Sequence, residues 1–343
     1  MKALVTAEVN TDIIKELEKL IDITYEGWEK EYRVLTEEEM ISYSRDKDIV
    51  ITSYDPITKK VINQCPNLKL IVFTRSNPVN IDIQYAREKN IKISYAPGRN
   101  ADCTAEFTVA LMLAVTRKIP MAYKALKDGK YVRLKGKQQT VQPGLRRDVT
   151  WDLNDKSPYV LFKGVQLKGK TVGIIGYGSI GRRVADICGA FGMNVLVNDP
   201  FVKNTDGITS VTFVSFEELL KQADIVSVHC KDCKETQNLI NARAFELMKK
   251  TALLINTSRG SLVDEQALID ALSSKKIAGA ALDVFSSEPI AADHPFITEL
   301  DNVVITPHLA GATYDAIDNH THQLVEDVKL FLEGKPLKYE YKL

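Results

Sequence analysis

Three side chains whose types suit proton and charge transfer each follow a short apolar run in the second half of the chain. They are Arg259, Glu288 and His308. An imidazole exchanges protons near neutral pH, a neighbouring carboxylate orients the ring and stabilises its charged form, and a guanidinium grips a carboxylate and polarises a ketone. Together they suit transfer of a hydride and a proton at C2 of a 2-hydroxy acid. Taken singly, they could equally be a salt-bridged loop arginine, a solvated acid and a loop histidine.

A second motif, GYGSIG at residues 176–181, fits the pattern G-x-G-x-x-G. An apolar run precedes it, a helical pattern follows, and the next apolar run ends in Asp199, near the spacing of a ribose-binding acid. Gly176 permits a tight turn, Gly178 lets backbone approach a pyrophosphate, and Gly181 packs helix on strand. Asp199 would repel a 2′-phosphate, so the motif favours NAD over NADP. A glycine-rich turn without a nucleotide is the alternative.

These residues must be positioned by strands that alternate with helices along the chain. Apolar runs at 2–7, 48–52, 68–74 and 91–96 predict strands of a first domain, and six further runs between 171 and 306 predict a second one. The alternation predicts an α/β fold of two doubly wound parallel sheets, in which polar groups past the strand ends line the ligand crevice. We place the domain limits at 1–100, 101–310 and 311–343, with the last helical segment returning to the first domain. The irregular stretch 130–165 is interpreted as a functional arm or an oligomer contact.

Composition excludes several classes of protein. The 343 residues hold 45 basic and 45 acidic side chains, so the basic excess typical of nucleic-acid or anionic-membrane binders is missing. We find no apolar stretch long enough to span a bilayer and no signal peptide, and five cysteines fit a reducing, cytoplasmic location. We expect no metal site: Cys230 and Cys233 lack a second pair, and the His320-x-His322 spacing puts the two rings on different helix faces.

The ordered motifs resemble those of the D-isomer-specific 2-hydroxy acid dehydrogenase family, and within it the phosphoglycerate-dehydrogenase-like branch. Besides GYGSIG with Asp199, they are NTSRG at 256–260, ALDVF at 281–285 continuing to Glu288, and PHLAG at 307–311. The resemblance implies a Rossmann NAD-binding domain inserted into a flavodoxin-like catalytic domain built from both chain ends. It also implies a homodimer formed through the NAD-binding domain.

The resemblance further implies roles for individual residues. The catalytic set would be Arg259, Glu288 and His308. Residues implied in NAD binding are Gly176, Gly178, Ser179, Ile180, Gly181, Asp199, Cys230, Thr257, Ser258, Arg259, Asp283, His308 and Gly311. Residues expected to bind the small-molecule substrate are Tyr54, Arg75, Ser76, Asn77, Arg259 and His308.

The chain departs from the family pattern at the expected substrate loop. Many members are glycine-rich there, whereas residues 75–80 read RSNPVN. Pro78 has no N–H and Arg75 adds a charge, which hints at a larger or more anionic acid. Two alternatives remain open. One is a nucleotide-sensing corepressor on the same fold. The other is formate dehydrogenase, which is less favoured because the formate dehydrogenases resemble a pattern with Gln at the position that Glu288 occupies here.

Overall fold

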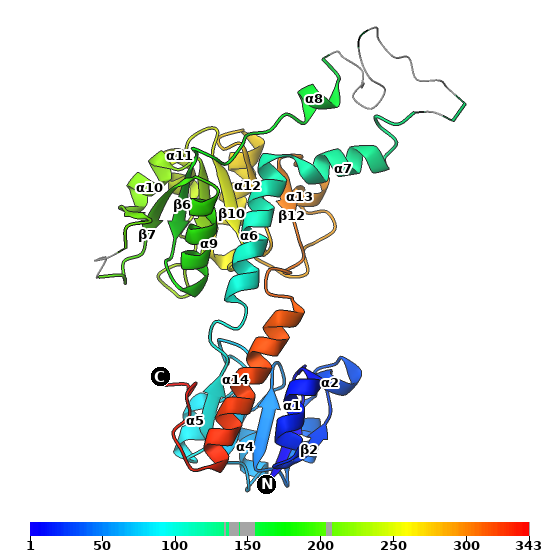
Figure 1. Cartoon of the computed structure of the whole chain (residues 1–343), viewed down its shortest axis with the longest axis vertical. Helices are drawn as coiled ribbons and strands as arrows, with labels where there is room; N and C mark the ends of the chain where they lie inside the picture. The colour runs from blue at the N-terminus through cyan, green and yellow to red at the C-terminus, as the bar shows by residue number, and fades with distance from the viewer. Residues whose placement is uncertain (134, 137–143, 145–154, 204–207, 343) are drawn as a thin grey trace. The chain divides into compact units, whose positions relative to one another are not determined.

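The computed structural model describes residues 1–133, 135–136, 144, 155–203 and 208–342 (Figure 1). The chain forms two compact units. Unit 1 combines Met1–Cys103 with Gly311–Leu343, and unit 2 is Thr104–Ala310. Half of the stretch 130–165, interpreted above as an arm or an oligomer contact, lies outside the described residues.

Unit 1 is built on a parallel sheet with the strand order β2-β1-β3-β4-β5. This is the flavodoxin-like order, and it confirms the fold class predicted for this part of the chain. The strands are β1 (Lys2–Val5), β2 (Asp22–Tyr25), β3 (Ile49–Thr52), β4 (Leu70–Phe73) and β5 (Lys92–Tyr95).

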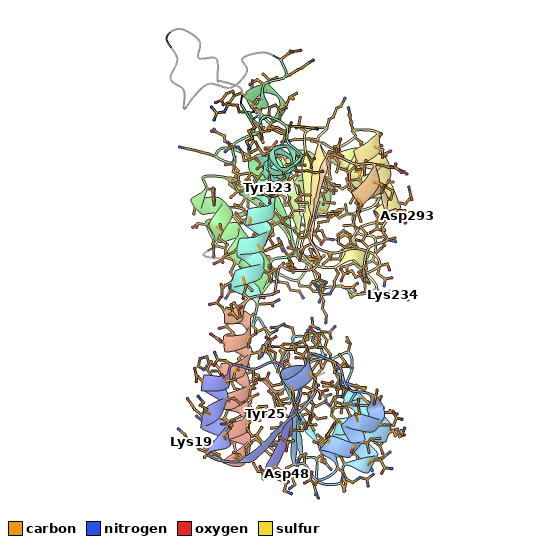
Figure 2. All side chains as sticks on the ribbon, turned by 90° about the vertical axis from the view of Figure 1, so that its right-hand side faces the viewer. Lys19, Tyr25, Asp48, Tyr123, Lys234 and Asp293 are labelled. Carbon is orange, nitrogen blue, oxygen red and sulfur yellow. The ribbon has the colours of Figure 1, made fainter. Side chains whose placement is uncertain are left out.

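Helices cover both faces of this sheet (Figure 2). Helices α1 (Thr11–Glu18) and α14 (Tyr314–Leu332) pack on one face, and α3 (Glu37–Ser44), α4 (Lys59–Gln64) and α5 (Ile83–Glu88) pack on the other. Successive strand residues point to opposite faces, so every residue of β3 and β4 is buried. This two-sided burial explains why these strands read as continuous apolar runs.

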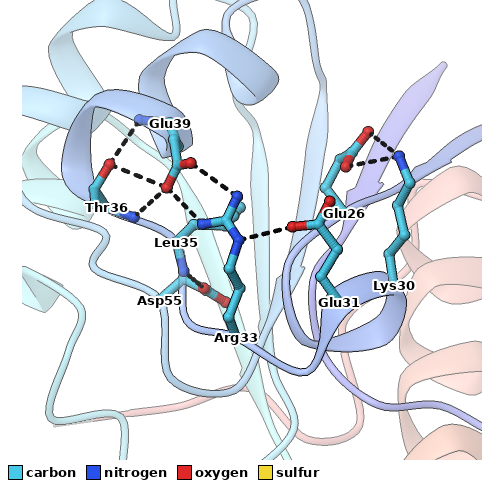
Figure 3. Close-up of polar contacts among 8 residues, drawn as sticks. All are labelled: Glu26, Lys30, Glu31, Arg33, Leu35, Thr36, Glu39 and Asp55. Atoms are coloured by element: carbon cyan, nitrogen blue, oxygen red, sulfur yellow. Dashed lines mark hydrogen bonds and ion pairs between the residues drawn. The ribbon is translucent and has the colours of Figure 1, made fainter.

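The segment between β2 and α3 carries the short helix α2 (Trp28–Glu31) and is held by polar contacts (Figure 3). Arg33 forms a two-pronged ion pair with Glu39, at 2.8 and 2.9 Å, and a third contact with Glu31. Thr36 and Glu39 close a capping box at the start of α3. The segment therefore has a defined course although it contains little regular structure.

Unit 2 contains a seven-stranded parallel sheet in the order β12-β11-β10-β9-β6-β7-β8. Its first six strands along the chain follow the Rossmann order, and β12 extends the sheet beyond β11. The strands are β6 (Thr171–Ile175), β7 (Asn194–Asn198), β8 (Thr212–Phe213), β9 (Ile225–Val228), β10 (Leu253–Asn256), β11 (Gly279–Leu282) and β12 (Val303–Ile305). The strand order reverses between β6 and β9, which is where such sheets bind ligands.

Two layers of helices enclose the sheet of unit 2. Helices α6 (Ala101–Thr116) and α9 (Ser179–Ala190) pack on one face, and α10 (Phe216–Gln222), α11 (Ala242–Leu247) and α12 (Glu265–Ser273) pack on the other. In the described part of unit 2, the remaining helical segments are α7 (Ile119–Lys127), α8 (Pro158–Leu161), α13 (Pro295–Thr298) and the 3₁₀ turn Gly260–Leu262. Across the described ranges, no helix is both long enough and apolar enough to span a bilayer.

The structure adds elements that the sequence pattern did not reveal. Strand β2 was not predicted because it is the edge strand of its sheet and its residues are only partly buried, so they form no apolar run. Strand β8 has two residues and sits at the other sheet's edge. At the start of α10, Ser215 and Glu218 form a capping box.

Candidate functional site

Strands β10, β11 and β12 bring the three candidate catalytic segments together at the carboxyl ends of the strands. The strands are adjacent and parallel, with Asn256 paired to Leu282 and Leu282 paired to Ile305. The turns that follow them carry Arg259, Glu288 and His308. Because the strands end in register, these turns all emerge at the carboxyl edge, where open α/β sheets bind ligands.

His308 and Glu288 are in direct contact. The Nδ1 atom of His308 lies 2.7 Å from Oε2 of Glu288, and Oε1 of Glu288 accepts a hydrogen bond from the Phe285 amide at 3.2 Å. Both side chains stay accessible, at 43% and 37% exposure. The contact orients the ring and leaves Nε2 as the nitrogen that faces away from the carboxylate.

The backbone around His308 is held in an uncommon conformation. His308 has a φ of 56°, in the left-handed region that non-glycine residues adopt uncommonly. Asp283 is fully buried and holds this loop: its Oδ1 accepts from the Thr306 hydroxyl (2.6 Å) and the Leu309 amide (2.8 Å), and its Oδ2 accepts from the Ala310 amide (2.8 Å). Both carboxylate oxygens of Asp283 are therefore engaged with the loop that bears His308. The NAD contact expected for Asp283 stays a prediction.

The turn that carries Arg259 packs against the turn that leads to Glu288. The buried Asn256 donates to the Arg259 carbonyl (2.8 Å) and accepts from the Ser258 amide (3.0 Å), which fixes the turn. A Cβ on Gly260 would lie 1.9 Å from the Phe285 carbonyl oxygen, so this turn rests against the one that leads to Glu288. The guanidinium itself donates to the Ser258 carbonyl at 2.6 Å.

The turn between β6 and α9 has the properties that a dinucleotide pyrophosphate needs. Gly176 has a φ of +93°, and a Cβ there would lie 2.5 Å from the Cys230 amide nitrogen. A Cβ on Gly181 would lie 2.1 Å from the Gly176 carbonyl oxygen, whereas one on Gly178 would meet nothing within 4 Å. Among the described residues, no side chain caps the first turn of α9, where Ser179 and Ile180 lie. The free amides and the open space at Gly178 thus fit a bound phosphate.

Asp199 lies just past the end of β7, next to this turn. Its Oδ2 accepts from the Tyr177 amide at 2.7 Å, and its Oδ1 accepts from the Phe201 amide at 2.9 Å. A carboxylate offers about four lone-pair sites. Two acceptor sites therefore remain for ribose hydroxyls, and the negative charge disfavours a 2′-phosphate.

His229 follows β9 at the switch point and was missed by the sequence reasoning. Its ring Nε2 lies 2.8 Å from the Ser227 hydroxyl, and its amide donates to the Ile175 carbonyl. Burial lowers the pKa of His229 to about 4, so the ring is neutral near neutral pH. The signal that could have found it is the rule already applied to His308, a polar residue directly after a strand.

Other predicted cofactor residues contact the same turns. The Ser258 hydroxyl donates to the Cys230 carbonyl at 3.0 Å, and Thr257 shares a 2.7 Å hydrogen bond with Thr108 of α6. Burial raises the pKa of the Cys230 thiol to about 11, which keeps it protonated. Gly311 is the one predicted cofactor residue that belongs to unit 1, where a Cβ would lie 2.4 Å from the Asn100 side chain.

The predicted substrate residues of unit 1 follow β3 and β4 at the carboxyl edge of that sheet. The Arg75 guanidinium lies 4.4 Å from the centre of the Tyr54 ring, and the Ser76 hydroxyl donates to the Ala96 carbonyl at 3.2 Å. Ser76 and Asn77 are exposed. Within the described ranges, no three His, Cys, Asp or Glu side chains are grouped so that they could hold a metal.

Comparison with known proteins identifies the family of the chain. Residues 109–310 match the family model for the D-isomer specific 2-hydroxyacid dehydrogenase, NAD binding domain. The chain is 38% identical over 302 residues to a glyoxylate reductase of Thermofilum pendens, covering 87% of this chain and 82% of that protein. It is 37% identical over 341 residues to a D-3-phosphoglycerate dehydrogenase of Archaeoglobus fulgidus, covering 98% of this chain and 58% of that protein.

A solved structure is similar over the full length. The TT0316 protein of Thermus thermophilus superimposes with a TM-score of 0.81 at 30% sequence identity, covering 100% of both chains. The family resemblance and the fold class predicted from the motifs are thereby confirmed. The chain belongs to the D-isomer specific 2-hydroxyacid dehydrogenase family and is an NAD-dependent oxidoreductase, with the match to the NAD-binding domain at residues 109–310.

Proposed function

We propose that the chain interconverts a D-2-hydroxy acid and its 2-oxo acid, with His308 as the proton-exchanging group. The observation that carries this proposal is the 2.7 Å contact between His308 and Glu288 at the sheet edge that also holds the Arg259 turn. Bound NAD supplies the hydride acceptor in one direction and the hydride donor in the other.

The chain's own residues handle the proton and the developing charge. Nδ1 of His308 is held by Glu288, so Nε2 is the atom that takes the C2 hydroxyl proton during oxidation and returns it during reduction. The Glu288 carboxylate stabilises the imidazolium while His308 carries the proton. Arg259 binds the substrate carboxylate and stabilises negative charge on the C2 oxygen.

NAD binding is assigned to the turn between β6 and α9 and to the turns beside it. Gly176, Gly178, Ser179, Ile180 and Gly181 would hold the pyrophosphate, and Asp199 the ribose. Two lone-pair sites on Asp199 remain for ribose hydroxyls, which supports NAD over NADP. Tyr54, Arg75, Ser76 and Asn77 are assigned to the substrate, together with Arg259 and His308.

We also propose a homodimer formed through unit 2 and a cytoplasmic location. Helices α7 and α8 expose apolar side chains, including Tyr123, Leu126 and Tyr159, which supports a protein interface there. All five cysteines are free thiols, as is usual in a reducing compartment.

The His308→Ala variant tests the catalytic assignment. Loss of the proton-exchanging group should lower kcat by roughly 10²- to 10⁴-fold, while the Kd for NADH should change little because the phosphate and ribose contacts remain. The matched control is His322→Ala, an exposed histidine on α14 that should behave as the unsubstituted enzyme. Full activity of His308→Ala with every reduced acid would refute the role.

A substrate panel separates the enzyme from a nucleotide-sensing protein on the same fold. NADH absorbance is followed with glyoxylate, hydroxypyruvate, its 3-phosphate, pyruvate and a 2-oxo sugar acid, and with NAD and formate. We expect turnover with at least one 2-oxo acid and none with formate. Tight NADH binding without turnover of any acid would favour the sensing function.

A further inference from the structure

The loop that carries Glu288 joins β11 to α13 and lies mostly at the surface of unit 2. Residues 286–289 and 291–293 are exposed, while Ile290 between them packs against the core. The Glu288 side chain itself is 37% exposed. Burial therefore contributes little to holding this carboxylate in place, and its position depends on what holds the two ends of the loop.

The carboxylate of Glu265 contacts both ends of this loop. Its Oε2 accepts from the Ser286 amide at 3.0 Å, and its Oε1 accepts from the Ser286 hydroxyl. Oε1 also lies 3.4 Å from Nε2 of His294, the residue that precedes α13. Glu265 is the first residue of α12, so a helix packed on the sheet supplies the anchor. We call Glu265, Ser286 and His294 the loop clasp.

The hydrogen bonds of His294 determine which of its ring nitrogens carries a proton. Nδ1 accepts from the Phe296 amide at 3.2 Å. A ring nitrogen that accepts has no proton, so the neutral ring carries its proton on Nε2 and donates it to Glu265. The side chains of His294 and Glu265 are 15% and 23% exposed, so this contact is partly shielded from water. Shielding strengthens a hydrogen bond to a carboxylate relative to the same bond at the surface.

Aromatic packing joins the same two ends of the loop. The centre of the Phe296 ring lies 4.5 Å from that of His294 and 6.5 Å from that of Phe285, and Phe296 is buried. Phe285 directly precedes Ser286, and its amide donates to Oε1 of Glu288 at 3.2 Å. The start of the loop therefore contacts the Glu288 carboxylate directly. Any displacement of this start would move the group that orients the catalytic histidine.

We propose that the loop clasp positions Glu288 against His308, with Glu265 as its central residue. Glu265, Ser286 and His294 are positioning residues, because they act through the Glu288 carboxylate rather than on the substrate. The contacts of the clasp and the contact between His308 and Glu288 all lie within unit 2. The inference rests on the proposed function, in which Glu288 orients the proton-exchanging ring.

Kinetic coupling to Glu288 tests this role. With the 2-oxo acid that is reduced fastest, Glu265→Ala should lower kcat by roughly 10- to 100-fold, because small displacements of a catalytic group are costly. The Kd for NADH should change little. In a Glu288→Ala background the same substitution should lower kcat by less than about twofold, because the group that it positions is gone. Equal losses in the two backgrounds would overturn the proposal, since a role in stability alone acts independently of Glu288.

Further variants separate hydrogen bonding from charge and from folding. Glu265→Gln keeps an oxygen that can accept from the Ser286 amide and an NH₂ group that can donate to its hydroxyl, so it should retain most of kcat. Asp270→Ala removes an exposed carboxylate from the same helix and should leave kcat unchanged. If Glu265→Ala does not fold, Ser286→Ala removes a single contact of the clasp and should show a smaller loss with the same dependence on Glu288.

The tautomer of His308 tests the geometry without turnover. Long-range proton–nitrogen correlation spectra at alkaline pH, assigned by the signals lost in His308→Ala, should show the neutral ring protonated on Nδ1, because that nitrogen faces Glu288. Glu265→Ala should shift the population towards the Nε2–H form, as Glu288→Ala does, and Asp270→Ala should not. An unchanged tautomer in Glu265→Ala would refute the clasp even if acids are reduced. The shift in a chain that reduces no acid would support the clasp and refute the proposed function.

Discussion

His308 and His320 differ in burial, and this difference gives their rings different roles. His308 is part-exposed and paired with a carboxylate, which suits proton exchange. His320 is 3% exposed, and burial lowers its pKa to about 4, so it serves as a neutral hydrogen-bonding link between Arg99 and the Glu8 carbonyl. Residue type alone could not separate these two roles, because both depend on the solvent and the partners around the ring.

The buried His320 predicts a specific dependence of stability on pH. Its pKa is about 4 in the folded chain and 6.5 as the reference value, so between these values the unfolded chain binds more protons and stability falls as the pH falls. From pH 7 to pH 5 the loss should be roughly 2 kcal/mol. His320→Gln, whose amide offers both an acceptor and a donor, should remove this part of the loss.

Urea unfolding at pH 7 and pH 5 measures this effect. Trp28 emission in the Trp151→Phe background reports on unit 1, in which both Trp28 and His320 lie. The same loss of stability in His320→Gln and in its parent would show that His320 does not titrate as inferred.

At the scale of elements, the three glycines of the turn before and within helix α9 differ in their steric environment. Gly176 and Gly181 are required by close backbone contacts, with a Cβ meeting backbone at 2.5 and 2.1 Å. Gly178 has no such steric requirement, because a Cβ there would meet nothing within 4 Å and its φ is −78°. We infer that Gly178 leaves room for a group from outside the chain, which is the role proposed for it beside a pyrophosphate at the helix N-terminus.

This difference yields a prediction with a control on the same helix. Gly178→Ala should fold normally but bind NADH at least about tenfold more weakly, because its methyl group occupies the space assigned to the phosphates. Gly189→Ala, near the end of α9 and also without a neighbour within 4 Å, should bind NADH normally and gain roughly 0.5–1 kcal/mol in stability. Isothermal titration and thermal unfolding measure both effects; normal NADH affinity in Gly178→Ala would contradict the assignment.

At the scale of the whole molecule, apolar exposure on unit 2 supports the proposed dimer. On α7, Ile119, Tyr123 and Leu126 are 54%, 64% and 47% exposed, and α8 is exposed at Tyr159, Val160 and Leu161. Monomeric proteins rarely leave such clusters in contact with water. The two helices are therefore the surface on which we place the proposed dimer.

Charged substitutions on this surface should dissociate the dimer. The double variant Tyr123→Asp, Leu126→Asp would force two desolvated charges into the interface, so light scattering should find 38.4 kDa rather than about twice that mass. Phe201→Asp is the control, since Phe201 is exposed on unit 2 but lies outside α7 and α8. The proposed interface would be wrong if the unsubstituted chain were monomeric or if the double variant remained dimeric.

Most strands, the dinucleotide fingerprint and the order of the catalytic residues could be predicted from sequence because each depends on local pattern. Burial on both faces makes strands such as β3 and β4 continuous apolar runs. The glycines of the turn after β6 are readable because two of their requirements are local: the φ of +93° at Gly176 and the close contact of Gly181 with the Gly176 carbonyl. The edge strand β2 escaped prediction because its half-exposed residues lack that signal.

The sequence by itself therefore determined the fold class, the family and the candidate catalytic set. Tertiary structure alone decided that Glu288 touches His308, that Asp283 holds the histidine loop, and that Trp28, Tyr54 and Arg75 stack. The physical reason is distance along the chain. Apolar periodicity reports which face of an element is buried, but contacts between residues tens of positions apart depend on how strands order in a sheet and on the turns that follow them.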